Sequence, residues 1–166
     1  MLADRPAVFE VGEEGAVEAR SPWYEPHSAG KAAIASFGRM IEDKARRQGV
    51  DPDLVKAVVF AEKARGHCFG AAKAAEGLGL AKSYPPMNIR PDIWSGLGLD
   101  PQSAQDPGDN ICAGVTLLKR LSDRAGDASI ESLATLWNSL AKEQRSEFGA
   151  YVRKVYDARP WRNADE

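Results

Sequence analysis

The sequence predicts an all-α fold, and three observations support this prediction. Apolar residues recur at three- and four-residue spacings in several segments, which is the period of an amphipathic helix. Several of these segments begin at a Ser that can cap a helix or at an Asp-Pro pair, and proline favours the first helical position. We find neither strands alternating with helices nor an internal repeat. The 166 residues suit one helical domain at residues 29–160, between an N-terminal arm at 1–28 and a C-terminal tail at 161–166.

The arm at residues 1–28 differs from the rest of the chain. Two short apolar runs flank Gly12-Glu13-Glu14-Gly15 and could form a small hairpin, and Pro22 and Pro26 then interrupt regular structure. Isolated hairpins are marginal in water. We therefore expect an arm that could order against the helical domain.

The first two helices are predicted from their caps. Ser28 is expected to begin a helix that runs to about Gln48 and ends at Gly49. The Asp-Pro pair at residues 51–52 starts the second helix, which we expect to stop at Gly66. The apolar face of the first helix consists of Ile34, Phe37, Ile41 and Ala45.

The remaining elements follow the same signals. Residues 71–77 could form a short helix, and residues 78–92 resemble an irregular loop. A second Asp-Pro pair stands at residues 100–101, and the pair at 106–107 opens a helix that ends near Gly126. Ser129 caps a helix over residues 130–141, and a last helix runs from about Glu143 to Arg159. The apolar stripes of the helices after residue 107 include Ile111, Val115, Leu118 and Leu121, and Phe148, Tyr151, Val152, Val155 and Tyr156.

Composition excludes several classes of protein. A net charge of −2 excludes a polycation that binds nucleic acid or anionic membranes by bulk charge. Cys68 and Cys112 are too few for a disulfide scaffold or a four-cysteine zinc site; they could form one disulfide or stay as two buried thiols. No apolar stretch approaches the roughly 20 residues of a membrane span, so no membrane insertion is expected.

Cofactor and metal motifs are missing from the sequence. There is no phosphate loop, dinucleotide fingerprint or nucleophile elbow. His67 and Cys68 are adjacent, but a zinc site needs three or four ligands. We therefore expect neither a metal nor a cofactor.

Glu62 is unusual because it continues an apolar face of the second helix. Leu54, Val58 and Glu62 are spaced four residues apart, so they lie along one side. A carboxyl group among apolar side chains has a raised pKa, which is what a general acid needs near neutral pH. The alternative is that Glu62 marks the exposed end of this face and pairs with a cation, for which the candidates are Lys63, Arg65 and Lys82.

Five short sequence segments, in the order in which they occur along the chain, are relevant to function. They are GVDPDLVKAVVFAE at residues 49–62, PMNI at 86–89 with Pro91 and Trp94 beyond it, DPGDNICAGV at 106–115, LWN at 136–138 and YVRKV at 151–155. Together they resemble the lysozyme-like superfamily, particularly lytic transglycosylases and goose-type lysozymes, over about residues 30–158.

The resemblance implies a lysozyme-like helical domain that degrades peptidoglycan. It maps Glu62 to the catalytic acid, PMNI to a segment lining the glycan cleft, and LWN to the family's Ala-Tyr-Asn. The substrate-binding residues that it implies are Met87, Asn88, Trp137, Asn138 and Tyr151. The alternative for Met87 and Trp137 is a role in core packing.

The sequence also departs from the family pattern. Lys63 follows the catalytic acid where the family usually has Ser, Asn88 stands in place of Gln, and Trp137 stands in place of Tyr. The Ser-x-x-Gly-Ala run that usually precedes the Met is replaced by GLGLAKSYPP. These departures fit a divergent branch of the family, and they also fit a domain that has lost its activity.

The expected reaction is cleavage of the β-1,4 bond between N-acetylmuramic acid and N-acetylglucosamine. A lytic transglycosylase needs only Glu62 as acid and base, and family chemistry implies a 1,6-anhydro product. A muramidase (lysozyme) that hydrolyses the bond would need a second carboxylate, for which Glu76 and Asp92 are the candidates. The sequence also leaves open a catalytically inactive glycan-binding or structural domain and an unrelated all-α interaction module.

The expected location conflicts with the expected substrate. The first residues have no basic start followed by an apolar run, so we expect synthesis in the cytoplasm without a signal peptide. Action on the cell wall then implies delivery by a secretion system, as for an antibacterial effector toxin, or release in phage lysis. The expected partners are peptidoglycan glycan strands and, for an effector, a neutralising immunity protein.

Overall fold

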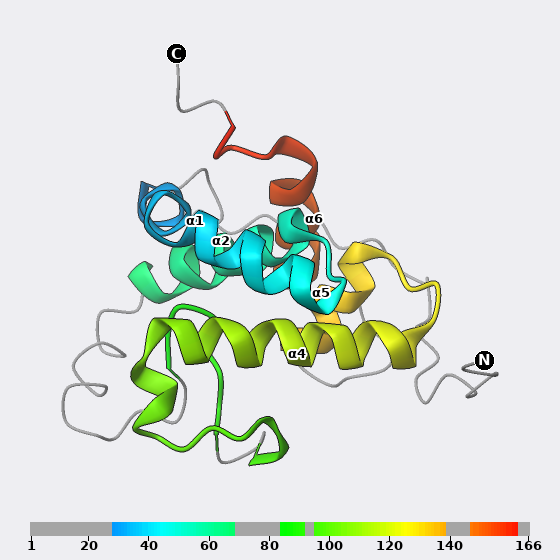
Figure 1. Ribbon diagram of the computed structural model, residues 1–166. Coiled ribbons are helices and arrows are strands. Elements are labelled where there is room, and N and C mark those ends of the chain that lie inside the picture. The colour runs from blue at the N-terminus through cyan, green and yellow to red at the C-terminus, as the bar shows by residue number, and fades with distance from the viewer. Residues whose placement is uncertain (1–27, 69–83, 92–94, 139–146, 163–166) are drawn as a thin grey trace.

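The structure, a computed structural model, describes residues 28–68, 84–91, 95–138 and 147–162. The predicted all-α fold is confirmed in this part of the chain, which holds five α-helices and no strand (Figure 1). The predicted N-terminal hairpin and the short helix at 71–77 lie outside the described residues. The α-helices are α1 (Ser28–Gln48), α2 (Pro52–Cys68), α4 (Pro107–Ala125), α5 (Ile130–Asn138) and α6 (Glu147–Ala158), and two short 3-10 helices span Ser95–Leu97 and Ser103–Gln105.

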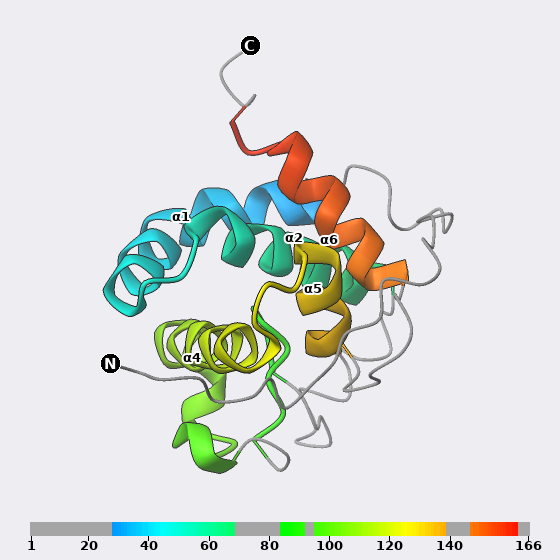
Figure 2. The ribbon, with the colours of Figure 1, turned by 90° about the vertical axis from the view of Figure 1, so that its right-hand side faces the viewer.

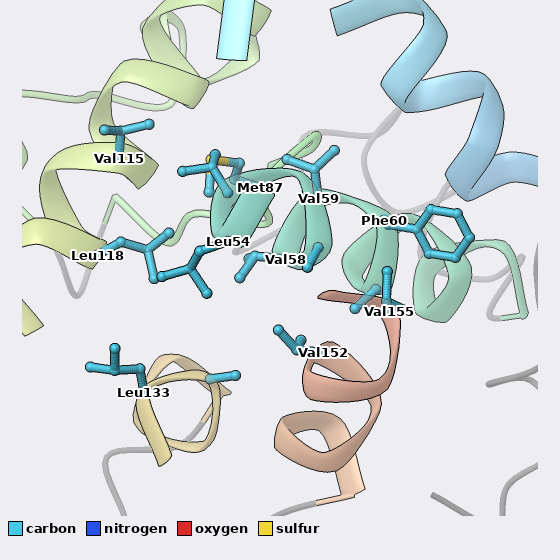
Figure 3. Packing of buried hydrophobic residues seen from close by; sticks show 14 of the residues in the cluster. Leu54, Val58, Val59, Phe60, Met87, Val115, Leu118, Leu133, Val152 and Val155 are labelled. Carbon is cyan, nitrogen blue, oxygen red and sulfur yellow. The ribbon is translucent and has the colours of Figure 1, made fainter. Parts of the chain in front are cut away.

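Helix α2 occupies the middle of the molecule (Figures 1 and 2). It packs against both α1 and α6, α6 packs against α5, and α4 contacts α1 and α5. From residue 57 to residue 61 every α2 side chain is fully buried. Apolar side chains on all sides of a helix require a buried helix, so the sequence AVVFA at these positions explains why α2 is central. Figure 3 shows the cluster that surrounds it.

The predicted starts of α2, α4 and α5 are confirmed, and each has a local capping hydrogen bond, whereas the predicted start of the last helix near Glu143 lies outside the described residues. The Asp51 side chain accepts from the Asp53 N–H at 2.9 Å, and the Asp106 side chain accepts from the Asp109 N–H at 2.9 Å. Ser129 Oγ accepts from the Ser132 N–H at the start of α5. These side chains satisfy N–H groups that have no partner in the first helical turn.

The end of α1 is also as predicted. Gly49 has a φ of 68°, and the Val50 N–H donates to the Ala45 carbonyl at 2.9 Å. This is the left-handed glycine cap that terminates many helices. It turns the chain within two residues into Asp51, the cap of α2.

The prediction that the second helix stops at Gly66 is wrong, because α2 continues to Cys68. A glycine inside a helix costs only about 1 kcal/mol relative to alanine. Gly66 lies within the helix, whereas Gly49 and Gly126 stand at helix ends with a positive φ. A glycine alone therefore does not end a helix.

Helices α5 and α6 approach each other closely at Gly149. A Cβ atom placed on Gly149 would lie 2.5 Å from the backbone oxygen of Glu131 and still closer to Thr135 Oγ1. The oxygen belongs to the backbone of α5, so it cannot rotate away. Only glycine allows this spacing of the two helices.

The C-terminal segment holds the start of α2. Asp53 forms ion pairs with Arg159 at 3.1 Å and Arg162 at 2.8 Å, and the Tyr156 hydroxyl donates to Asp51. The hydrogen bond to Asp51 raises the pKa of Tyr156. We call these five residues the C-terminal clamp.

Lys56 is a charged residue on the buried part of α2. Its side chain is 10% exposed, and its Nζ donates to Glu42 Oε1 of α1 at 2.6 Å. The hydrogen bond from Lys56 lowers the pKa of Glu42. A buried ammonium needs such a partner, because desolvation without one is costly.

Within the described ranges, none of the helices has the length and apolarity that a membrane-spanning helix requires.

We expect Gly149→Ala to lower the free energy of unfolding by about 1–3 kcal/mol, because the new methyl group forces α5 and α6 apart. Urea unfolding followed by circular dichroism measures this change. Gly96→Ala is the matched control, because the nearest atom to its Cβ would be Arg120 Nη1 at 3.9 Å. Equal effects of the two substitutions would contradict the close packing.

We expect Glu42→Gln to lower the free energy of unfolding at pH 7 by about 1–2 kcal/mol, since Lys56 loses its charged partner and Glu42 is itself partly exposed. The folded pKa of Glu42 lies below its ordinary value of 4.5, so this contribution is present above pH 4.5 and is lost as the pH falls through the folded pKa.

Urea titrations of both proteins at several pH values should therefore show the difference between wild type and Glu42→Gln shrinking in acid. Asp43→Asn is the control, because the Asp43–Arg47 pair on the same helix is exposed on both sides and contributes less than about 0.5 kcal/mol. A difference that stays constant from pH 7 to pH 3 would contradict the role of the Lys56 pair.

Candidate active site

Glu62 is buried on α2, with only 6% of its surface exposed. It follows Val58 and Val59 by one helical turn, and both valines are fully buried. Burial argues against the alternative in which Glu62 is the exposed end of the apolar face. The residue therefore brings a carboxyl group into the apolar interior, where it needs hydrogen-bond donors.

Trp137, near the end of α5, supplies such a donor. Its indole Nε1 donates to Glu62 Oε1 at 3.0 Å, although the two residues are 75 positions apart in the sequence. The Trp137 side chain is half-buried. The structure thus brings together two residues that the sequence analysis selected separately, and the bond fixes one oxygen of the Glu62 carboxyl group.

The turn Tyr84–Ile89 holds two further predicted residues. Tyr84 and Ile89 close the turn with two backbone hydrogen bonds of 2.9 and 3.0 Å. Asn88 is half-buried and has a φ of 57°, a left-handed conformation that Asn tolerates better than most residues. The turn thus presents Asn88 in a defined backbone geometry.

Met87 in the same turn is fully buried. Its side chain packs on Gly114 of α4, where a Cβ would lie 2.8 Å from Met87 Cε. In Figure 3 it lies between Val115 of α4 and Val59 of α2. Met87 is therefore a core residue in this structure, in agreement with the alternative that it packs in the core. It also anchors the turn that carries Asn88.

Tyr151 of α6 is also a core residue here. It is 1% exposed, and its ring lies 6.5 Å from the ring of Phe60, centroid to centroid. A contact between Tyr151 and a substrate stays a prediction.

The remaining predicted site residues are not placed by the structure. Glu76 and Asp92, the candidates for a second carboxylate, lie outside the described residues, and so does Trp94. Asn138 is the last residue of α5, but its side chain is likewise outside the described part. The residues 28–68, 84–91, 95–138 and 147–162 contain no group of three or more His, Cys, Asp or Glu that could hold a metal ion.

Asn110 is an important residue to which the sequence analysis gave no role. It is fully buried in the first turns of α4, and its amide accepts from the Met87 N–H and donates to the carbonyls of Tyr84 and Ala104. A signal was present in the sequence: Asn110 directly precedes the apolar stripe that begins at Ile111 and stands four residues before Gly114. Its partners lie in loops and could not be inferred from spacing.

No family model, no curated protein and no solved structure matches the chain. A buried carboxyl group with one oxygen held by an indole N–H is suited to hold and transfer a proton.

We expect Trp137→Phe to lower the free energy of unfolding at pH 7 by about 1–3 kcal/mol, because Glu62 Oε1 loses a buried hydrogen bond. Urea unfolding measures the change. Trp161→Phe is the matched control, since the indole nitrogen of Trp161 is buried and has no hydrogen-bond partner among the described residues. If the two variants lose equal stability, the bond between Trp137 and Glu62 contributes nothing of its own.

Proposed function

We propose that this protein cleaves the β-1,4 bond between N-acetylmuramic acid and N-acetylglucosamine in peptidoglycan, as a lytic transglycosylase with Glu62 as its acid and base. The observation that supports this proposal most strongly is the bond between Glu62 and Trp137. The motif resemblance assigned these two residues to the catalytic acid and to the glycan cleft on separate grounds. Their contact is what a shared site requires.

Burial of Glu62 supports its role as the acid. Only 6% of the residue is exposed, and a reacting group that is shielded from water interacts more strongly with the bound substrate. In the proposed reaction the protonated group donates to the glycosidic oxygen as the bond to the muramic acid carbon breaks. The N-acetyl group of the same sugar then stabilises that carbon.

Glu62 acts as the base in the second step. It takes the proton from the 6-hydroxyl of the muramic acid, whose oxygen bonds to the same sugar carbon and displaces the N-acetyl group. The product is a 1,6-anhydro sugar, and Glu62 is again protonated. One carboxyl group therefore completes the cycle, and the sequence of steps needs no water.

Trp137 orients the acid in this proposal. Its N–H fixes Oε1, so the carboxyl group keeps one orientation toward the scissile bond. In the enzymes that the motifs resemble, a tyrosine stands at the corresponding position, and both side chains offer a hydrogen-bond donor on an aromatic ring. Delivery by a secretion system or in phage lysis, and an immunity partner, stay predictions from the resemblance.

We expect Glu62→Gln to reduce the release of anhydro-muropeptides from purified sacculi at least about 1,000-fold, because glutamine keeps the size of the side chain and removes the transferable proton. Mass spectrometry of the soluble products measures this. Glu42→Gln is the matched control: it makes the same chemical change on α1 and should keep its activity where it is folded.

Three results would contradict the proposal in different ways. Equal activity of Glu62→Gln and wild type would remove Glu62 from the chemistry. Reducing-end muramic acid without anhydro products would identify a hydrolase instead. Binding of the wild type to sacculi without any released product would indicate an inactive glycan-binding domain.

A further inference from the structure

Asn110 connects three backbone groups that belong to two separate loops. Its side-chain oxygen accepts from the Met87 N–H at 2.9 Å, and its side-chain nitrogen donates to the Tyr84 carbonyl at 2.9 Å and the Ala104 carbonyl at 3.0 Å. Both N–H hydrogens of the amide are thus used. The side chain is fully buried, so water cannot replace these bonds.

The turn Tyr84–Ile89 depends on these bonds because it has little regular structure of its own. A single pair of backbone hydrogen bonds closes it. Without Asn110 the Met87 N–H would lose the acceptor that the structure shows, and the Tyr84 carbonyl would keep the Ile89 N–H but lose its second donor. Buried backbone groups without partners are strongly disfavoured, so the turn would have to move to find new ones.

Packing attaches the turn to α4 at a second point, one helical turn beyond Asn110. Met87 rests on Gly114, which has no side chain to keep it away. On its other side Met87 faces Val59 of α2 (Figure 3). Glu62 follows Val59 by three residues, so it lies on the same side of α2. The turn is therefore fixed against the stretch of α2 that leads to Glu62.

We infer that Asn110 is a positioning residue: it holds the turn Tyr84–Ile89 so that Asn88 faces the glycan bound at Glu62. This inference rests on the proposed function. Asn110 touches neither the substrate nor Glu62, and it acts only through the backbone of the turn. Its contribution is to substrate binding, whereas proton transfer belongs to Glu62.

The test uses Asn110→Asp, which keeps the acceptor for the Met87 N–H and replaces both donors by an oxygen facing two carbonyls. We expect KM for soluble glycan strands to rise about 10-fold or more while kcat changes less than about 3-fold. Hydrogen exchange of the Met87 and Ile89 amides should become at least about 10-fold faster. All measurements are made where circular dichroism shows each variant folded.

Leu121→Ala is the matched control for stability. Leu121 lies on the same helix, is 4% exposed, and is about 16 Å further along α4. This variant should lose stability without a change in KM or in the exchange of the turn amides. An equal rise of KM in Leu121→Ala would mean that KM reports only general destabilisation, and would overturn the inference.

A second variant covers the case in which Asn110→Asp does not fold. Gly114→Ala displaces Met87 without touching Asn110, and it should raise KM and amide exchange in the same way. Sacculus pelleting in the Glu62→Gln background measures binding without turnover, and both turn variants should bind about 10-fold more weakly.

The outcomes separate the inference from the proposed function. If wild type releases no product but the turn variants bind sacculi more weakly, the proposed reaction fails and the role of Asn110 stands. If wild type releases anhydro products and the turn variants keep KM and binding unchanged, the inference about Asn110 is overturned and the proposed reaction stands. Wild type that neither cleaves nor binds overturns both.

Discussion

The central position of α2 is the constraint on which the other contacts depend. Other helices pack around it, so each polar group on α2 must find its partner on another element. Lys56 finds Glu42 on α1, and Glu62 finds Trp137 on α5. A carboxyl group in this position is kept only with a specific donor. The burial that organises the core therefore also places the Glu62 carboxyl group in apolar surroundings with the Trp137 N–H as a donor.

The sequence predicted local features of the fold well and tertiary features poorly. The starts of α2, α4 and α5 were predictable because the capping side chain and the N–H that it binds are two or three residues apart. The extension of α2 to Cys68 was missed because glycine only weakens a helix, and the outcome depends on packing. The apolar neighbours of Glu62 left open whether it was buried or marked the exposed end of the apolar face, and only the structure shows that it is buried.

Residues of the candidate site could be selected from the sequence, but their contacts with one another could not. Glu62 and Trp137 were selected from motifs, but a hydrogen bond across 75 positions has no signal in the spacing of either motif. Asn110 was not selected as a site residue at all, because its bonds reach 23 and 26 residues back to a loop of irregular backbone. Loop conformations depend on such side-chain bonds, which neither periodicity nor propensity describes.

The C-terminal clamp has a consequence for how the chain acquires its structure during synthesis. Its bonds join residues 105 and 109 positions apart. A ribosome releases α2 long before it releases Tyr156, Arg159 and Arg162. The beginning of the helix that carries Glu62 therefore waits for residues 156–162 to emerge before its partners arrive, and contacts this distant in sequence slow folding. Residues 156–162 thus complete the packing at the junction between α1 and α2.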